Sequence, residues 1–154
     1  MSIEFCVACG HDTDIRRETE RTEYLVRGEA IAVDVTVRVC PSCGVKEIDT
    51  SLGDPVEFAF REYRTRHGLL QPEEIRQIRE RCGASQLSLA TLLGMSQATL
   101  NRYEGGSIQE ATHDNVLRAC RDANFFRDLF ARRGHLLTHG QSARVERSFV
   151  TPES

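Results

Sequence analysis

Two short cysteine motifs constrain this chain more than any other feature. They are Cys6-Val7-Ala8-Cys9-Gly10 and Cys40-Pro41-Ser42-Cys43-Gly44. In each motif, two residues separate the cysteines, so both sulfurs can converge on one ion, and the glycine accommodates the tight turn that follows. Four thiolates form a closed tetrahedral set that suits Zn²⁺. We therefore expect one structural zinc ion per chain, held by Cys6, Cys9, Cys40 and Cys43.

Other roles for the cysteines are weaker. A C-x-x-C pair can be a thioredoxin-like redox pair, but that fold needs a βαβ context that the sequence lacks. Four cysteines can also hold an iron–sulfur cluster, although motifs closed by glycine at hairpin ends favour zinc. His11 is close enough to the first motif to replace a ligand, but four cysteines suffice and we expect an exposed loop histidine. Cys82 and Cys120 lie on apolar helix stripes, where buried thiols are expected.

Length and composition favour a water-soluble protein of one ordinary domain or two small ones. The 154 residues are 40% hydrophobic and 28% charged. No apolar run approaches the roughly 20 residues of a membrane span, and no basic segment precedes an apolar one at the N-terminus. We expect a cytoplasmic protein without membrane contact, whose cysteines are reduced and bind metal rather than form disulfides.

The net charge of −3 is unevenly distributed along the chain. Residues 1–71 carry 9 basic and 13 acidic side chains, whereas residues 72–134 carry 9 and 8. DNA binding requires a locally basic face rather than a basic protein. The charge balance thus permits DNA binding without arguing for it.

Residues 1–53 have the pattern of a small β module. Alternation from Ala30 onward places one apolar face on a strand, formed by Ile31, Val33, Val35, Val37 and Val39. The segment 22–26 is its expected antiparallel partner, with Arg27-Gly28-Glu29 as the turn. A two-stranded hairpin is marginal in water, so metal binding would have to supply folding free energy.

The rest of the chain is predicted to be helical. Residues 54–70 form a linker helix, which begins after the N-cap Asp54 and ends by Gly68. Residues 71–134 have the caps and apolar stripes of five helices, and residues 135–154 are expected to be a flexible tail. The predicted fold class is α+β, with a small N-terminal zinc-bound β-hairpin module followed by an all-α five-helix domain of the Xre helix-turn-helix type.

The spacing from Gln86 to Leu100 is typical of a helix-turn-helix. Ala90 is small enough for the second helix to cross closely, Gly94 supplies the positive φ of the turn, and Leu100 fills the space beneath the second helix. If Leu100 and Tyr103 point inward, the opposite stripe of the second helix faces outward. A helical bundle that uses these residues for packing is the alternative.

The outward stripe contains side chains that recognise DNA bases. Glutamine and asparagine pair with adenine, and arginine pairs with guanine. Hydroxyl groups and helix N-termini are better placed for phosphates. The predicted DNA-binding residues are Gln86, Ser96, Gln97, Ala98, Thr99, Asn101 and Arg102.

These motifs together resemble the MqsA (YgiT-type) antitoxin family, which joins a paired C-x-x-C zinc module to an Xre-like helix-turn-helix ending in Arg-Tyr-Glu. The resemblance extends from Cys6 to about Phe130. It implies a homodimer that binds a palindromic operator and represses its own operon. It further implies that the zinc module holds a cognate toxin, usually an mRNA interferase.

The family's functional residues carry over in part. Cys6, Cys9, Cys40 and Cys43 match the metal ligands, and Arg102 matches a base-contacting arginine. The family's asparagine one turn earlier falls at Ala98, so Gln97 or Asn101 takes its role and the operator sequence does not transfer.

Two functions remain open at this stage. The first is an autoregulating antitoxin, and the second is a stand-alone regulator whose zinc module senses metal or oxidant. No Ser/His/Asp set, paired acids or phosphate-binding loop is evident in the sequence, so we do not expect an enzyme.

Overall fold

The chain forms two compact units. The computed structural model describes residues 2–150, and the division between the units falls within one helix, between Tyr63 and Arg64. Each unit is considered by itself below. Among the described residues, the helices are too short or too polar to cross a lipid bilayer.

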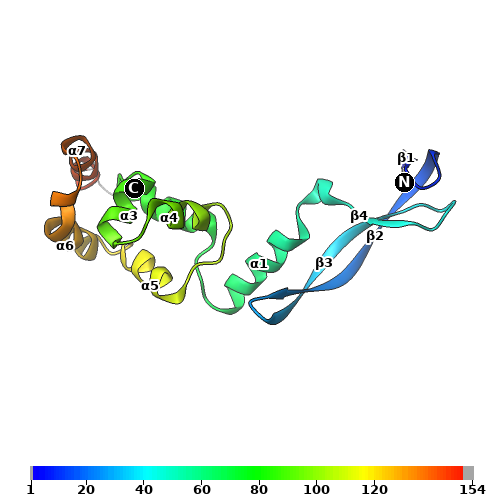
Figure 1. The fold of residues 1–154 in the computed structure, drawn as a ribbon, viewed down its shortest axis with the longest axis horizontal. Coiled ribbons are helices and arrows are strands. Elements are labelled where there is room, and N and C mark those ends of the chain that lie inside the picture. The colour runs from blue at the N-terminus through cyan, green and yellow to red at the C-terminus, as the bar shows by residue number, and fades with distance from the viewer. Residues whose placement is uncertain (1, 151–154) are drawn as a thin grey trace. The chain divides into compact units, whose positions relative to one another are not determined.

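The first unit contains an antiparallel sheet of β1 (Ser2–Cys6), β2 (His11–Val26), β3 (Glu29–Val39) and β4 (Lys46–Ile48), arranged in that order (Figure 1). The predicted hairpin turn is confirmed, because Val26 pairs with Glu29 across Arg27 and Gly28. Both turn residues have positive φ, at 49° and 80°, as a two-residue turn between strands requires.

The sheet is larger than the expected hairpin. β2 begins at His11 and pairs along the whole of β3, and β1 and β4 extend the sheet on either side. The first half of β2 carries mostly charged side chains, so its apolar alternation is weak in the sequence. Cross-strand ion pairs hold that half, as described below.

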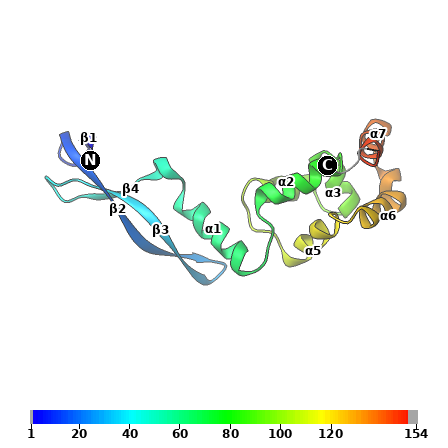
Figure 2. The ribbon, with the colours of Figure 1, turned by 180° about the vertical axis from the view of Figure 1, so that it is seen from behind.

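The valine face of β3 is confirmed. Its five predicted apolar side chains are all at most 8% exposed. After the short η1 (Thr50–Leu52), helix α1 (Pro55–Arg66) runs back alongside the hairpin in both views (Figures 1 and 2). Pro55 and Ala59 are buried on its first half. The helix begins where predicted, since the carboxylate of Asp54 accepts a hydrogen bond of 2.9 Å from the Val56 N–H.

The second unit contains α2 (Pro72–Arg81), α3 (Gln86–Leu93), α4 (Gln97–Glu104), α5 (Ala111–Ala119), α6 (Ala123–Arg133), η2 (Gly134–Leu136) and α7 (His139–Ser148). Side-chain caps at Ser85, Ser96 and Asp122 set three of the helix starts. All of these helices except η2 contribute to one core, which includes Leu70, Ile75, Ile78, Leu89, Leu92, Leu100, Leu117, Phe126, Leu129 and Val145. The buried thiols of Cys82 and Cys120 also belong to this core, as predicted.

The count of five helices for this domain was too low, because α7 lies in the segment expected to be a flexible tail. A capping box between Thr138 and Gln141 starts α7, and Val145 is fully buried. Phe149 packs edge-on against Phe126 and Phe130 of α6, and both views place α7 beside α6 (Figures 1 and 2). Residues 151–154 of the predicted tail lie outside the described residues.

The close approach of α7 depends on a glycine. Gly83 has a φ of +66°, and a Cβ at this position would lie 2.9 Å from the backbone oxygen of Arg144. The Ser148 hydroxyl donates a hydrogen bond of 3.2 Å to the carbonyl of the adjacent Cys82. A larger residue would therefore strain the backbone and push α7 away.

Replacing Gly83 with alanine should lower the free energy of unfolding by about 1–2 kcal/mol or more, through left-handed backbone strain and the clash with α7. Thermal or urea unfolding followed by circular dichroism at 222 nm measures this. Gly140→Ala is the matched control, because a Cβ there meets nothing within 4 Å. Equal stabilities of the two variants would contradict this packing of α7.

Candidate metal centre and nucleic-acid interface

The four predicted ligand cysteines converge at one end of the sheet. Their sulfurs all lie within 4.8 Å of one another. The sulfurs of Cys6 and Cys43 are 3.8 Å apart, and those of Cys9 and Cys40 are 3.7 Å apart. A tetrahedron of sulfurs about 2.3 Å from a central zinc ion has edges of about 3.8 Å. The cluster therefore fits one tetrahedral metal ion.

The backbone shapes each cysteine motif in the same way. The Gly10 N–H donates to the Cys6 carbonyl, and the Gly44 N–H donates to the Cys40 carbonyl, each at 2.8 Å. Both glycines have a φ near +75°. One motif forms the β1–β2 turn and the other forms the turn between β3 and β4. An ion held here would join two turns that are about thirty residues apart in the chain.

The surroundings favour an ionised sulfur at Cys40. The hydrogen bond from the Thr13 hydroxyl, at 3.5 Å, and the backbone N–H of Cys43 lower the pKa of Cys40 to about 5. The pKa of Cys9 is instead raised. The larger cause is its contact with the Cys43 sulfur, and the smaller one is burial. Several thiolates within 4.8 Å of one another repel unless a cation lies between them. The donor set thus suits a thiophilic divalent ion.

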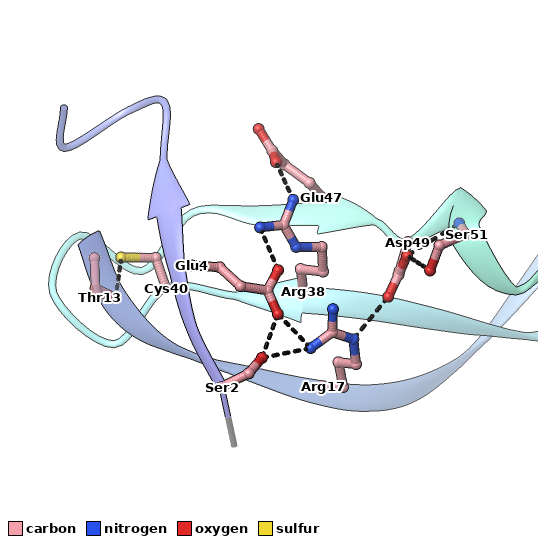
Figure 3. A network of polar contacts seen from close by, with 9 residues as sticks. All are labelled: Ser2, Glu4, Thr13, Arg17, Arg38, Cys40, Glu47, Asp49 and Ser51. Atoms are coloured by element: carbon pink, nitrogen blue, oxygen red, sulfur yellow. Dashed lines mark hydrogen bonds and ion pairs between the residues drawn. The ribbon is translucent and has the colours of Figure 1, made fainter. Parts of the chain in front are cut away.

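A polar network crosses the sheet next to the cluster (Figure 3). Glu4 of β1 accepts from Arg17 of β2 and from Arg38 of β3, each at 2.8 Å. Arg17 also donates to Asp49 at 2.8 Å, and Asp49 accepts from the Ser51 N–H at 3.1 Å. The hydrogen bond from Arg17 lowers the pKa of Glu4 to about 2, and those from Ser51 and Arg17 do the same for Asp49. These charged contacts join the strands on a face that offers little apolar burial.

His11 lies outside the cluster, as expected. It is exposed at the start of β2, and its Nδ1 lies 3.3 Å from the Cys9 carbonyl.

The helix-turn-helix consists of α3 and α4. Gly94 ends α3 in the left-handed conformation, with φ at 77°, as predicted for the turn. Ala90 and Leu100 are almost completely buried, and so is Tyr103 at 6% exposure. The close crossing and the inward face of α4 are therefore confirmed.

The outward stripe of α4 is exposed. Gln97, Ala98, Asn101 and Arg102 are all exposed on the side opposite Leu100. The guanidinium of Arg102 lies 3.3 Å from the Thr99 hydroxyl, on its own helix. Gln97 lies one turn before Asn101, and Ala98 lies one turn before Arg102, so the four side chains form a continuous surface.

The remaining predicted DNA-binding residues lie at helix starts. Ser96 caps α4, accepting from the Thr99 N–H at 3.1 Å, and its hydroxyl is 2.8 Å from the Thr99 hydroxyl. Gln86 is half-buried in the first turn of α3. Ser96 and Thr99 thus already stabilise the N-terminus of the helix that carries the stripe.

Two arginines that the sequence patterns did not reveal hold the helix-turn-helix in position. Arg79 of α2 donates to both carboxylate oxygens of Glu104 at the end of α4, at 2.8–3.2 Å. Arg133 of α6 donates to the carbonyls of Leu92 and Thr91, at 2.8 and 3.2 Å, and so caps α3 at the turn. Arg79 and Glu104 are 25 residues apart in the chain, so sequence spacing could not identify this pair.

The comparison with known families bears on both sites. The profile described as the antitoxin component of bacterial toxin–antitoxin systems, MqsA, matches residues 4–121, which is more than half of the chain. The chain belongs to the MqsA antitoxin family. The matched range includes the four cysteines and the whole helix-turn-helix of this antitoxin, but not α6 and α7. Neither a curated protein nor a solved structure matches the chain.

Replacing Cys40 with serine should abolish stoichiometric metal binding, because the serine hydroxyl does not ionise at neutral pH and is a poor ligand for a thiophilic ion. Elemental analysis of the purified full-length chain measures this. Cys82→Ser is the control, since this thiol belongs to the helical core, and it should retain one ion per chain. Loss of metal in the control, or its retention in Cys40→Ser, would contradict the assignment.

Proposed function

We propose that this chain is an antitoxin that also represses its own operon. Its helical unit binds a palindromic operator as a homodimer, and its N-terminal unit, which contains one structural Zn²⁺, binds the cognate toxin. Membership of the antitoxin family supports the antitoxin role and the toxin partner. The exposed stripe of α4 is the observation that carries DNA recognition.

The stripe presents chemistry that distinguishes bases. Asn101 and Arg102 are adjacent and exposed, and one can pair with adenine and the other with guanine. Gln97 lies one turn before Asn101 and provides a second amide. The ion pair between Arg79 and the buried Glu104 fixes the end of α4, so the stripe is presented by a rigid helix.

An apolar edge supports partner binding by the N-terminal unit. β1 is at the edge of the sheet, and Ile3, Phe5 and Val7 are 71%, 56% and 77% exposed. Ile3 and Phe5 lie on β1, and Val7 follows in the adjacent turn. Exposed apolar residues along a sheet edge are typical of a surface that binds another protein. The net negative charge of residues 1–71 favours a basic partner such as a nuclease.

A second candidate is a stand-alone regulator that senses oxidant through the metal centre. It is favoured by the exposure of Cys43 at one corner of the cluster. In that case operator affinity would change with oxidant in the absence of any toxin.

The double substitution Asn101→Ala and Arg102→Ala should weaken operator binding, because each lost base pairing costs about 1–3 kcal/mol. Fluorescence anisotropy with duplex DNA from the chain's own promoter measures the affinity. The matched control replaces Asn124 and Arg132, both exposed on α6, with alanine. Unchanged affinity in the first variant would remove this stripe from operator recognition.

Replacing Phe5 with aspartate should abolish capture of the toxin encoded beside this gene, because a charge would interrupt the apolar edge. Co-purification with the tagged toxin measures capture. Leu25→Asp is the control, since Leu25 is 79% exposed beside the β2–β3 turn. If Phe5→Asp captured toxin as well as the control does, the edge of β1 would not be the toxin-binding surface.

A further inference from the structure

The second unit contains a cavity that neither proposed activity uses. Its volume is about 980 Å³, and its walls come from the C-terminal end of α2, from Cys120 and Arg121 just after α5, and from α6 and α7. The stripe proposed to contact DNA lies on α4, outside these walls. Two of the walls come from helices beyond the range that matches the family.

The walls carry an excess of positive charge. They include five arginines, which are Arg81, Arg121, Arg127, Arg144 and Arg147. The lining acid is Glu80, and Arg121 has an ion pair with Glu74 at 3.1 Å. All five arginines are exposed, and they outnumber the one acid of the lining, so the cavity attracts anions.

The cavity also has an aromatic wall. Phe126 is buried and contacts Phe149 edge-on, with ring centroids 6.0 Å apart. The guanidinium of Arg127 lies 5.3 Å from the centroid of the Phe149 ring and donates to the Phe149 carbonyl at 3.2 Å. The guanidinium therefore covers one face of the Phe149 ring. Because Arg127 is exposed and lines the cavity, the outer face of its guanidinium offers a stacking surface for a flat ring.

We propose that this cavity binds a small organic polyanion with an aromatic ring, of the nucleoside polyphosphate class. Guanidinium groups bind phosphate oxygens in pairs of parallel hydrogen bonds, so the arginines of α2 and α7 would hold the phosphates. The ring would stack on the guanidinium of Arg127, which itself lies over Phe149. The volume lies within the range of small-molecule sites, about 300–1,000 Å³.

The position of the cavity would couple such a ligand to the packing of α7. Arg81 is the last residue of α2, and Arg144 and Arg147 lie on α7. Phosphates bound by Arg81 and by the two arginines of α7 would therefore bridge the two helices. A ligand that binds this folded arrangement stabilises it by mass action. The melting temperature of the full chain should therefore rise with ligand concentration.

Isothermal titration of the full-length chain with ATP tests the proposal. We expect saturable binding with a Kd below about 1 mM, and weaker binding of adenosine and of inorganic triphosphate. Replacing both Arg144 and Arg147 with alanine should weaken ATP binding at least about tenfold, whereas Arg132→Ala should have no effect. Arg132 is the control because it lies on α6 outside the cavity and pairs with Asp128 at 3.0 Å.

Several results would overturn the proposal. These are the absence of saturable ATP binding, equal affinity for ATP and inorganic triphosphate, or equal losses in the cavity and control variants. Displacement of ATP by duplex DNA of unrelated sequence, with the same dependence on Arg144 and Arg147, would instead make the cavity a DNA phosphate site. If the alanine variant melts early, Arg144→Lys with Arg147→Lys retains charge and should still lose affinity through lost paired hydrogen bonds.

Discussion

The convergence of four cysteine sulfurs on one point is the interaction on which the first unit depends. Close to the cluster the apolar core is small, formed by Cys6, Ile15 and Cys40 with Cys9 and Val45 packed against it. So small a number of apolar contacts cannot offset the loss of conformational entropy when two turns and a short edge strand become ordered. An ion held by the sulfurs would supply that free energy, and the network around Glu4 and Arg17 aligns the strands beside it.

The second unit is stabilised differently, by an apolar core and two arginines that fix the helix-turn-helix. Arg79 neutralises a glutamate whose side chain is 2% exposed, and Arg76 lies 3.6 Å from the same carboxylate. Removing Arg79 would take away the hydrogen bonds to both oxygens of this buried carboxylate. Arg133 donates to the carbonyls of Leu92 and Thr91 at the end of α3, where helix carbonyls have few partners within their own helix. Because both arginines act on α3 or α4 from other helices, the position of the exposed stripe depends on the whole domain, including α6.

The sequence predicted those features that are determined by residues close together in the chain. The cysteine spacing, the alternation in β3, the serine caps and Gly94 each determine structure within a few residues. The first half of β2 and helix α7 were missed because long-range contacts stabilise them, namely cross-strand ion pairs in β2 and the packing of Val145 and Phe149 in α7. The partners of Glu104 and of the α3 carbonyls were missed for the same reason, since no sequence spacing relates them.

The central claim is that metal supports the N-terminal unit while the helical unit folds on its own core. Chelation of the metal from the full-length chain, followed by amide hydrogen exchange, tests it most directly. The account predicts that amides of β1–β4 lose protection while those of α2–α6 keep theirs, and that operator affinity measured in parallel is retained. Simultaneous loss of protection in both units, or full protection of the sheet without metal, would contradict it.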